Sequence, residues 1–234
     1  MASFLGAFID RSLDNKSIIK PASFCNFCKK PLRKIALIPV FGFLFEKGKC
    51  HYCGSKVPKI YPIMEIVLGF FYLICFYFYG FSYNALLHIL IGSTLFAASY
   101  MDYKSLEIYD LFSYIILLIS SIYYMIKGDV DIFILSILFA LILFIIFKLI
   151  NIFYKDGNGF GDGDVYLIAS VVYFFGFPNG LYFLTSSFVI GSLIGIFLLI
   201  IKKNSKTTLL PFVPFLFLGH IIYIIIENYY LIYF

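Results

Sequence analysis

From Pro62 onward, long apolar runs alternate with short polar breaks. Each run is near the roughly 20 residues that a helix needs to cross the hydrocarbon core of a bilayer. Only helices and closed barrels satisfy every backbone polar group in that medium. The pattern therefore predicts an all-α polytopic membrane protein with about seven transmembrane helices. The predicted spans are residues 62–80, 84–101, 109–126, 131–153, 164–177, 180–201 and 211–233.

Composition agrees with a bilayer as the main solvent. Hydrophobic residues make up 62% of the chain and charged residues 13%, with a mean hydropathy of +0.96. A typical soluble domain is about a quarter charged, so this composition excludes an ordinary soluble protein. The first ten residues are too short to span a bilayer, and they lack the basic region and cleavage site of a secretory signal peptide.

Basic residues set the expected orientation. Of the 18 Lys and Arg, 11 precede Tyr61, and such a block is typical of a cytoplasmic anchor rather than a nucleic-acid surface. The outer loops then hold only Lys127, whereas six lysines fall in or near the inner loops. These six are Lys104, Lys148, Lys155, Lys202, Lys203 and Lys206. We therefore expect a multi-pass protein of the inner (cytoplasmic) membrane without a nucleic-acid partner.

The N-terminal part carries two C-x2-C pairs, formed by Cys25, Cys28, Cys50 and Cys53. Two such pairs bring four thiolates to one tetrahedral centre, as in structural zinc sites. Two disulfides are the alternative, but stable disulfides are rare in the cytoplasm. We predict a cytoplasmic four-cysteine zinc-knuckle domain over residues 1–61 and a transmembrane domain over residues 62–234. Cys75 stands apart, within the first predicted span, and is interpreted as a packing residue.

Acids at the ends of the apolar runs are candidates for catalysis, because carboxylates at membrane depth are costly and usually functional. Asp102 ends one run, and Asp164 follows a loop rich in glycine, which lets a substrate backbone approach closely. Peptide hydrolysis by two carboxylates needs one ionised, to draw a proton from water, and one protonated, to polarise the scissile carbonyl. Two acids sharing a site do not both ionise readily, so proximity supplies both forms. Asp102 and Asp164 are the predicted pair.

Other acids have simpler interpretations. Asp110 opens a predicted helix, where capping is the expected role. Glu65 and Glu107 are candidate supporting residues, although Glu65 equally suits the membrane interface. Asp162 competes with Asp164, because G-x-G-D occurs twice in overlap, over residues 159–164.

The chain resembles the type IV prepilin leader peptidases, aspartyl proteases whose second aspartate lies in a G-x-G-D motif. The blocks that carry the resemblance are residues 2–11, 17–31, 61–65, 102–110, 161–165 and 210–216. The resemblance implies that Asp102 and Asp164 are the catalytic pair and that the four cysteines match the cysteine pairs of the family. It also implies prepilin or pseudopilin substrates, cut at the cytoplasmic face, with S-adenosylmethionine as methyl donor in those members that methylate the new N-terminus.

The match separates the two overlapping motifs. Val165 and Leu167 follow Asp164 as in the family's pattern, whereas Tyr166 occupies a place where Lys is common. The chain begins where the family usually has the end of a first membrane helix, so that helix is either lacking or lies upstream.

Two hypotheses from other classes remain open. In a transporter, paired acids would carry ions and would lie near the bilayer midplane. In a zinc-stabilised assembly protein of a secretion system, changing Asp102 and Asp164 to Asn would leave substrate processing intact.

Overall fold

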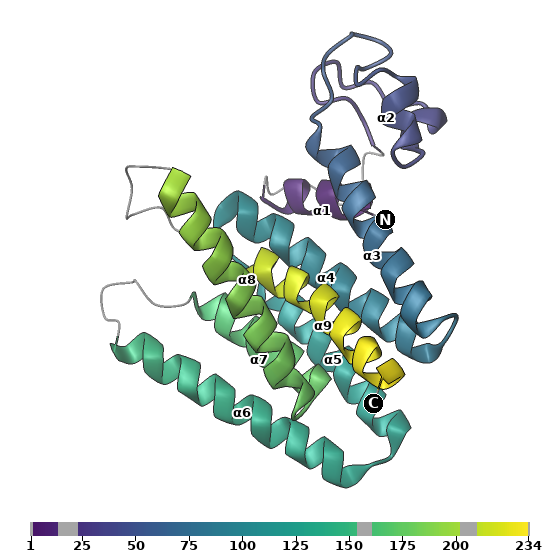
Figure 1. Cartoon of the computed structure of the whole chain (residues 1–234). Coiled ribbons are helices and arrows are strands. Elements are labelled where there is room, and N and C mark those ends of the chain that lie inside the picture. Colours follow the sequence, from purple (N-terminus) through teal and green to yellow (C-terminus); the bar gives the residue numbers. More distant parts are fainter. Residues whose placement is uncertain (1, 14–22, 154–160, 202–209, 234) are drawn as a thin grey trace. The chain divides into compact units, whose positions relative to one another are not determined.

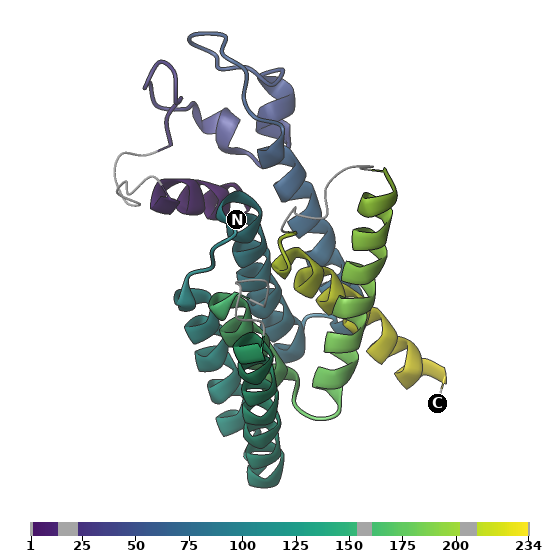
Figure 2. The ribbon, with the colours of Figure 1, turned by 90° about the vertical axis from the view of Figure 1, so that its left-hand side faces the viewer.

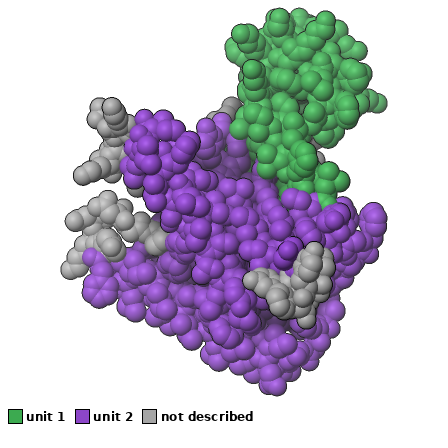
Figure 3. All heavy atoms as spheres, in the orientation of Figure 1, with its two compact units in different colours: residues 1–73 green, residues 74–234 purple. Residues whose placement is uncertain are grey.

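The computed structural model describes residues 2–13, 23–153, 161–201 and 210–233. The chain divides into two compact units, Met1–Leu73 and Ile74–Phe234 (Figure 3). This division falls inside helix α3 (Ile60–Tyr79), beyond the boundary expected at residue 61. The two-domain assignment by residue number stays a prediction.

The first unit consists of short helices and turns held by side-chain hydrogen bonds. Its elements before α3 are α1 (Ala2–Leu13), a 3-10 turn η1 (Lys34–Leu37) and α2 (Phe41–Phe45). The Tyr61 hydroxyl donates to Asp10 at 2.7 Å, and the Val40 amide donates to Glu65 at 2.6 Å. Glu65 therefore anchors the backbone of this unit where α2 begins.

The second unit is a bundle of helices that follow one another through short connections (Figure 1). They are α4 (Tyr83–Ser105), α5 (Asp110–Lys127), α6 (Val130–Phe153), α7 (Asp162–Phe175), α8 (Asn179–Ile201) and α9 (Val213–Tyr233). Together with α3 they occupy the seven predicted spans, which confirms an all-α, multi-pass membrane protein. Among the described residues, α3, α4, α5, α6 and α8 are long and apolar enough to cross a membrane. Residues 154–160 and 202–209, which hold four of the inner-loop lysines, lie outside the described residues.

Helix α7 is short, and other helices enclose it. It has 14 residues, nine of them buried, and it packs against α5, α6 and α8 (Figure 1, Figure 2). A helix surrounded by protein need not match the full hydrocarbon thickness, since its neighbours meet the lipid instead. The fifth predicted span, residues 164–177, is thus an interior helix, and its first turn carries Asp164.

The C-terminal end of α7 is fixed by two hydroxyl groups from neighbouring helices. Tyr124 of α5 donates to the carbonyl oxygens of Tyr173 and Phe174, at 3.1 and 3.3 Å, and accepts from Ser136 of α6 at 2.8 Å. Gly176 follows with φ of +66° and ψ of −176°, a region open essentially to glycine alone. A Cβ there would lie 2.6 Å from Ser136 Oγ and 2.8 Å from Tyr124 Oη.

We expect Gly176→Ala to lower the thermal stability of the detergent-solubilised protein more than Gly128→Ala does. Gly128 also has positive φ, +71°, but no atom lies within 4 Å of a Cβ built there. The control therefore measures the cost of a left-handed backbone, roughly 1–2 kcal/mol, whereas Gly176→Ala meets a backbone region more restricted to glycine and also separates Tyr124 from Ser136. Equal losses in Tm would show that the two hydroxyls do not hold the end of α7.

Candidate functional site

Asp102 lies in the last turns of α4 and is only 4% exposed. Its Oδ2 accepts a hydrogen bond from the amide of Val213, the first residue of α9, at 2.9 Å. The first amides of a helix have no partner inside the helix and carry partial positive charge. The helix N-terminus thus meets the buried carboxylate.

Val213 is a partner that reasoning from the sequence missed. A signal was present in the proline-containing block at residues 210–216, because Pro214 falls in the first turn, where proline is favoured. That signal marks the start of a helix. It does not indicate that an acid more than a hundred residues earlier accepts its first amide hydrogen.

Asp164 lies in the first turn of α7. Its charge interacts with that of Asp102, so the structure brings the two predicted acids into one site. Asp164 Oδ1 is buried, and no group in the described part of the chain donates a hydrogen bond to it. An unpaired buried oxygen of this kind is available to a substrate or a water molecule.

The glycines of the motif allow segments of the protein to approach one another. A Cβ on Gly163 would lie 3.1 Å from the carbonyl oxygen of Ile108, and a Cβ on Gly161 would lie 3.1 Å from Asp164 Oδ2. Gly163 therefore lets the α4–α5 connection lie against the start of α7. The sequence predicts that the glycines admit a substrate backbone, and in the structure Gly163 admits a segment of the protein itself. Residues 157–160 of the loop lie outside the described residues.

Asp162 is in a different environment from Asp164. Its side chain is 74% exposed and pairs with Lys148 of α6, with Nζ 2.6 Å from Oδ1. Lys148 also lies over the ring of Tyr166, 4.9 Å from its centroid. The two acids of the overlapping motifs thus differ in both exposure and partner.

Asp110 is the first residue of α5, but it is not the capping residue. Tyr109 occupies the N-cap position and makes no side-chain capping bond. Asp110 is exposed and contributes negative charge near the positive end of the helix. The prediction that Asp110 begins a helix is therefore confirmed, and the prediction that it caps that helix is wrong. Glu107, in the preceding connection, is also exposed.

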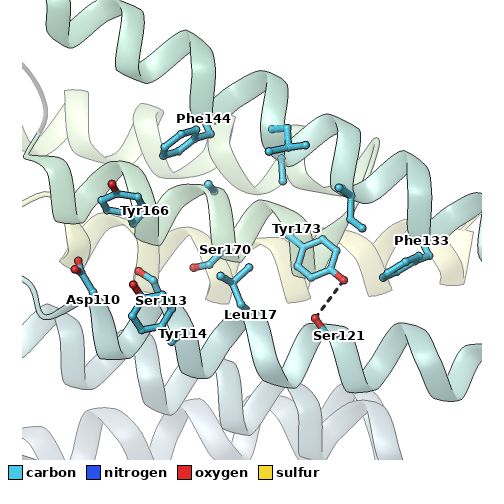
Figure 4. Close-up of a pocket in the computed structure, with 14 residues that line it drawn as sticks. Asp110, Ser113, Tyr114, Leu117, Ser121, Phe133, Phe144, Tyr166, Ser170 and Tyr173 are labelled. Carbon is cyan, nitrogen blue, oxygen red and sulfur yellow. Dashed lines mark hydrogen bonds between the residues drawn. The ribbon is translucent and has the colours of Figure 1, made fainter.

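A pocket of about 500 Å³ begins at Asp110 and lies between α5, α6 and α7 (Figure 4). Most of its lining is apolar, with hydroxyl groups from serine and tyrosine at intervals. Ser113 is 2% exposed, and its Oγ has no hydrogen-bond partner among the described residues.

The four paired cysteines of the first unit form one cluster. All four Sγ atoms lie within 4.8 Å of one another, and two pairs of them lie 3.8 and 3.9 Å apart. A tetrahedral ion with metal–sulfur bonds of about 2.3 Å sets its sulfurs about 3.8 Å apart. The cluster therefore fits a single metal ion such as zinc. His51 faces Arg33, with Nδ1 3.0 Å from Nη1, and is not one of the four.

Hydrogen bonds and burial shift the pKa values of the thiols in the cluster. The Ser55 hydroxyl, followed by the backbone amide of Cys28, lowers the pKa of the Cys25 thiol to about 6. The Lys30 amide lowers the pKa of Cys28, but burial and the other three thiols raise it to about 11. Four thiolates therefore do not gather here without a cation to balance their charge.

Two family models match the chain. The Bacterial Peptidase A24 N-terminal domain matches residues 1–79, and the Type IV leader peptidase family matches residues 89–196. The first match contains the cysteine cluster and the second contains Asp102 and Asp164.

Curated relatives match along most of the chain. A Bacillus subtilis protein named prepilin leader peptidase/N-methyltransferase is 29% identical, over 88% of this chain and 82% of its own length. A Pseudomonas putida protein of the same name is 27% identical, over 84% and 69%. An Escherichia coli O78:H11 protein, named type 4 prepilin-like proteins leader peptide-processing enzyme, is 29% identical, over 94% and 81%. No solved structure matches the chain significantly.

We expect the purified protein to hold about one equivalent of a thiophilic divalent metal per chain. Changing Cys25 and Cys50 together to Ser should release it, because each C-x2-C pair then loses a thiolate. Cys75→Ser is the control, since Cys75 is buried in α3 and is not part of the cluster. Metal analysis of the three proteins checks this, and an unchanged content in the double variant would rule the cluster out as a metal site.

Proposed function

The chain belongs to the type IV leader peptidase family, and we propose that it removes the N-terminal leader peptide of type IV prepilins or pseudopilins. Asp102 and Asp164 are the proposed catalytic residues. We place the reaction at the cytoplasmic face of the inner membrane, where the basic N-terminal block predicts that both acids lie. The observation that most supports the proposal is the electrostatic interaction between Asp102, buried on α4, and Asp164, partly buried on α7.

The surroundings of the two carboxyl groups suggest a division of roles. The Val213 amide hydrogen bond favours the ionised form of Asp102, since a donor stabilises negative charge. Asp164 lacks a donor at Oδ1, so in the proposed mechanism it carries the shared proton. Asp102 then draws a proton from water, and Asp164 polarises the scissile carbonyl. The water oxygen adds to the carbonyl carbon, the C–N bond breaks, and the amine departs with a proton from the pair.

Two cofactors complete the proposal. We assign a structural Zn²⁺ to Cys25, Cys28, Cys50 and Cys53, on the fit of their sulfur spacing. When bound, this ion would hold the loops of the first unit together. We also propose that the new N-terminus is methylated with S-adenosylmethionine, as the name of the Bacillus subtilis relative suggests. None of the described residues is assigned to that methyl donor.

The carboxylate roles predict a clear order among three variants. Asp102→Asn and Asp164→Asn should each lower leader cleavage by at least about a hundredfold, the contribution that a general acid or base makes. Asp162→Asn should retain most activity, because Asp162 is exposed and pairs with Lys148. The measurement is the mobility shift of a co-expressed prepilin.

Three results of this experiment would correct the proposal. Cleavage by Asp164→Asn but not by Asp162→Asn would transfer the role to the other motif. Cleavage by all three variants would favour a non-catalytic assembly protein. Ion flux that depends on both acids, without cleavage, would favour a transporter.

Mass spectrometry of the processed substrate tests both proposed activities together. We expect a single cut that removes the leader, with one methyl group added to the new N-terminal nitrogen. Asp164→Asn should leave the substrate uncut and unmethylated, because the amine does not exist before cleavage. A cut but unmethylated product would limit the function to proteolysis.

A further inference from the structure

The pocket between α5, α6 and α7 begins at Asp110 and Tyr166. Asp110 is two residues along the chain from Ile108, which lies against Gly163, and Tyr166 is two residues from Asp164. Asp110 and Tyr166 lie at one end, and Phe133 and Tyr173 lie toward the other (Figure 4). The lining residues of α5 extend from Asp110 to Ser121, which corresponds to roughly 16 Å at the rise of an α-helix. At the Asp110 end, the close approach of Gly163 to Ile108 holds the start of α7 against the α4–α5 connection.

One buried hydroxyl in this pocket has no hydrogen-bond partner within the described part of the chain. Ser113 Oγ is buried and unbonded within the described chain, and an unmet buried hydroxyl costs about 1–3 kcal/mol. Ser170, also in the lining, donates to the carbonyl of Leu167 at 2.7 Å. Ser120, on the same helix but outside the pocket, donates to Ile116 at 2.7 Å. Ser113 is thus placed to meet a polar group that the pocket's occupant supplies.

We propose that this pocket binds the apolar part of the substrate that directly follows the scissile bond, with the Ser113 hydroxyl bonded to its backbone. The inference rests on the proposed function. A volume of about 500 Å³ is in the range of ligand pockets but is too small for a whole membrane helix. The occupant is therefore a short stretch of apolar residues.

The chemistry of the lining favours a peptide over a lipid tail. An acyl chain has no hydrogen-bonding group and leaves Ser113 unmet. A peptide offers free backbone groups, because the first four amides of any helix lack partners inside it. If the apolar segment of the substrate is helical, its free amides lie at the start of that helix, next to the scissile bond. Ser113 lies one helical turn from Asp110 and can accept a hydrogen bond at that point.

Two pairs of variants test this, with two substrates that share the leader and scissile bond. The long substrate keeps its apolar segment, and the short peptide ends soon after the cut. Leu117→Trp fills the pocket, whereas its neighbour Leu118, 63% exposed and outside the lining, gives the control Leu118→Trp. Ser113→Ala removes the hydroxyl, and Ser120→Ala is its control.

We expect Leu117→Trp to raise KM for the long substrate at least about tenfold, with kcat within about twofold, because uniform binding is lost. Ser113→Ala should raise KM about fivefold, the value of one hydrogen bond. Both controls should match the wild type, and cleavage of the short peptide should be unchanged in all four variants.

Other outcomes overturn the inference. Equal KM values for Leu117→Trp and Leu118→Trp would show that the substrate does not bind in the pocket. Equal slowing of the long and the short substrate by Leu117→Trp would show the same. If Leu117→Trp displaces a co-purified lipid, seen by native mass spectrometry, without changing KM, the occupant is a lipid. Failure of the wild type to cut either substrate would instead defeat the proposed peptidase function itself.

Discussion

A carboxylate buried among membrane helices needs a group that meets its charge, and Asp102 meets the first amide of α9. The hydrogen bond joins residues that are 111 positions apart in the chain. It joins the end of α4, which is predicted to be cytoplasmic, to the start of α9. Asp164 must lie near this junction to share a site with Asp102. A helix N-terminus offers this compensation without adding another charged side chain to the bilayer.

Both ends of α7 depend on contacts that a larger residue would prevent. At its start, Gly163 admits the Ile108 backbone and so keeps Asp164 beside the α4–α5 connection. At its end, Gly176 leaves room for Tyr124 and Ser136. Contacts at both ends therefore restrict sliding of α7 along its axis as well as sideways movement. A displaced α7 would carry Asp164 away from Asp102. Catalysis by two acids is sensitive to such shifts, because a misplacement of about 1 Å can cost about a hundredfold in rate.

The helices could be predicted from the sequence because lipid demands long apolar runs, and the cysteine cluster because C-x2-C pairs have few other uses. The enclosure of α7 could not, since its apolar residues look alike whether they face lipid or protein. The bond between Asp102 and Val213 and the pairing of Lys148 with Asp162 depend on how distant helices pack. Hydrophobic periodicity contains no information about such pairs. The overlapping motifs contain two acids; the residues after Asp164 favour it from the sequence, and the folded chain adds a difference in exposure and in partner.

Buried polar groups in the second unit fall into two kinds, and the difference bears on function. At one end, Tyr79 and Tyr223 each donate a hydrogen bond to Glu227, so these three side chains satisfy one another. Near the acids, Asp164 Oδ1 and Ser113 Oγ find no partner in the described chain. Folding gains nothing from an unmet buried polar atom, so such atoms persist where a ligand or water completes them. The satisfied network therefore belongs to the scaffold. In the proposed mechanism the two unsatisfied oxygens meet the peptide substrate, Asp164 Oδ1 at the bond to be cut and Ser113 Oγ along the segment beyond it.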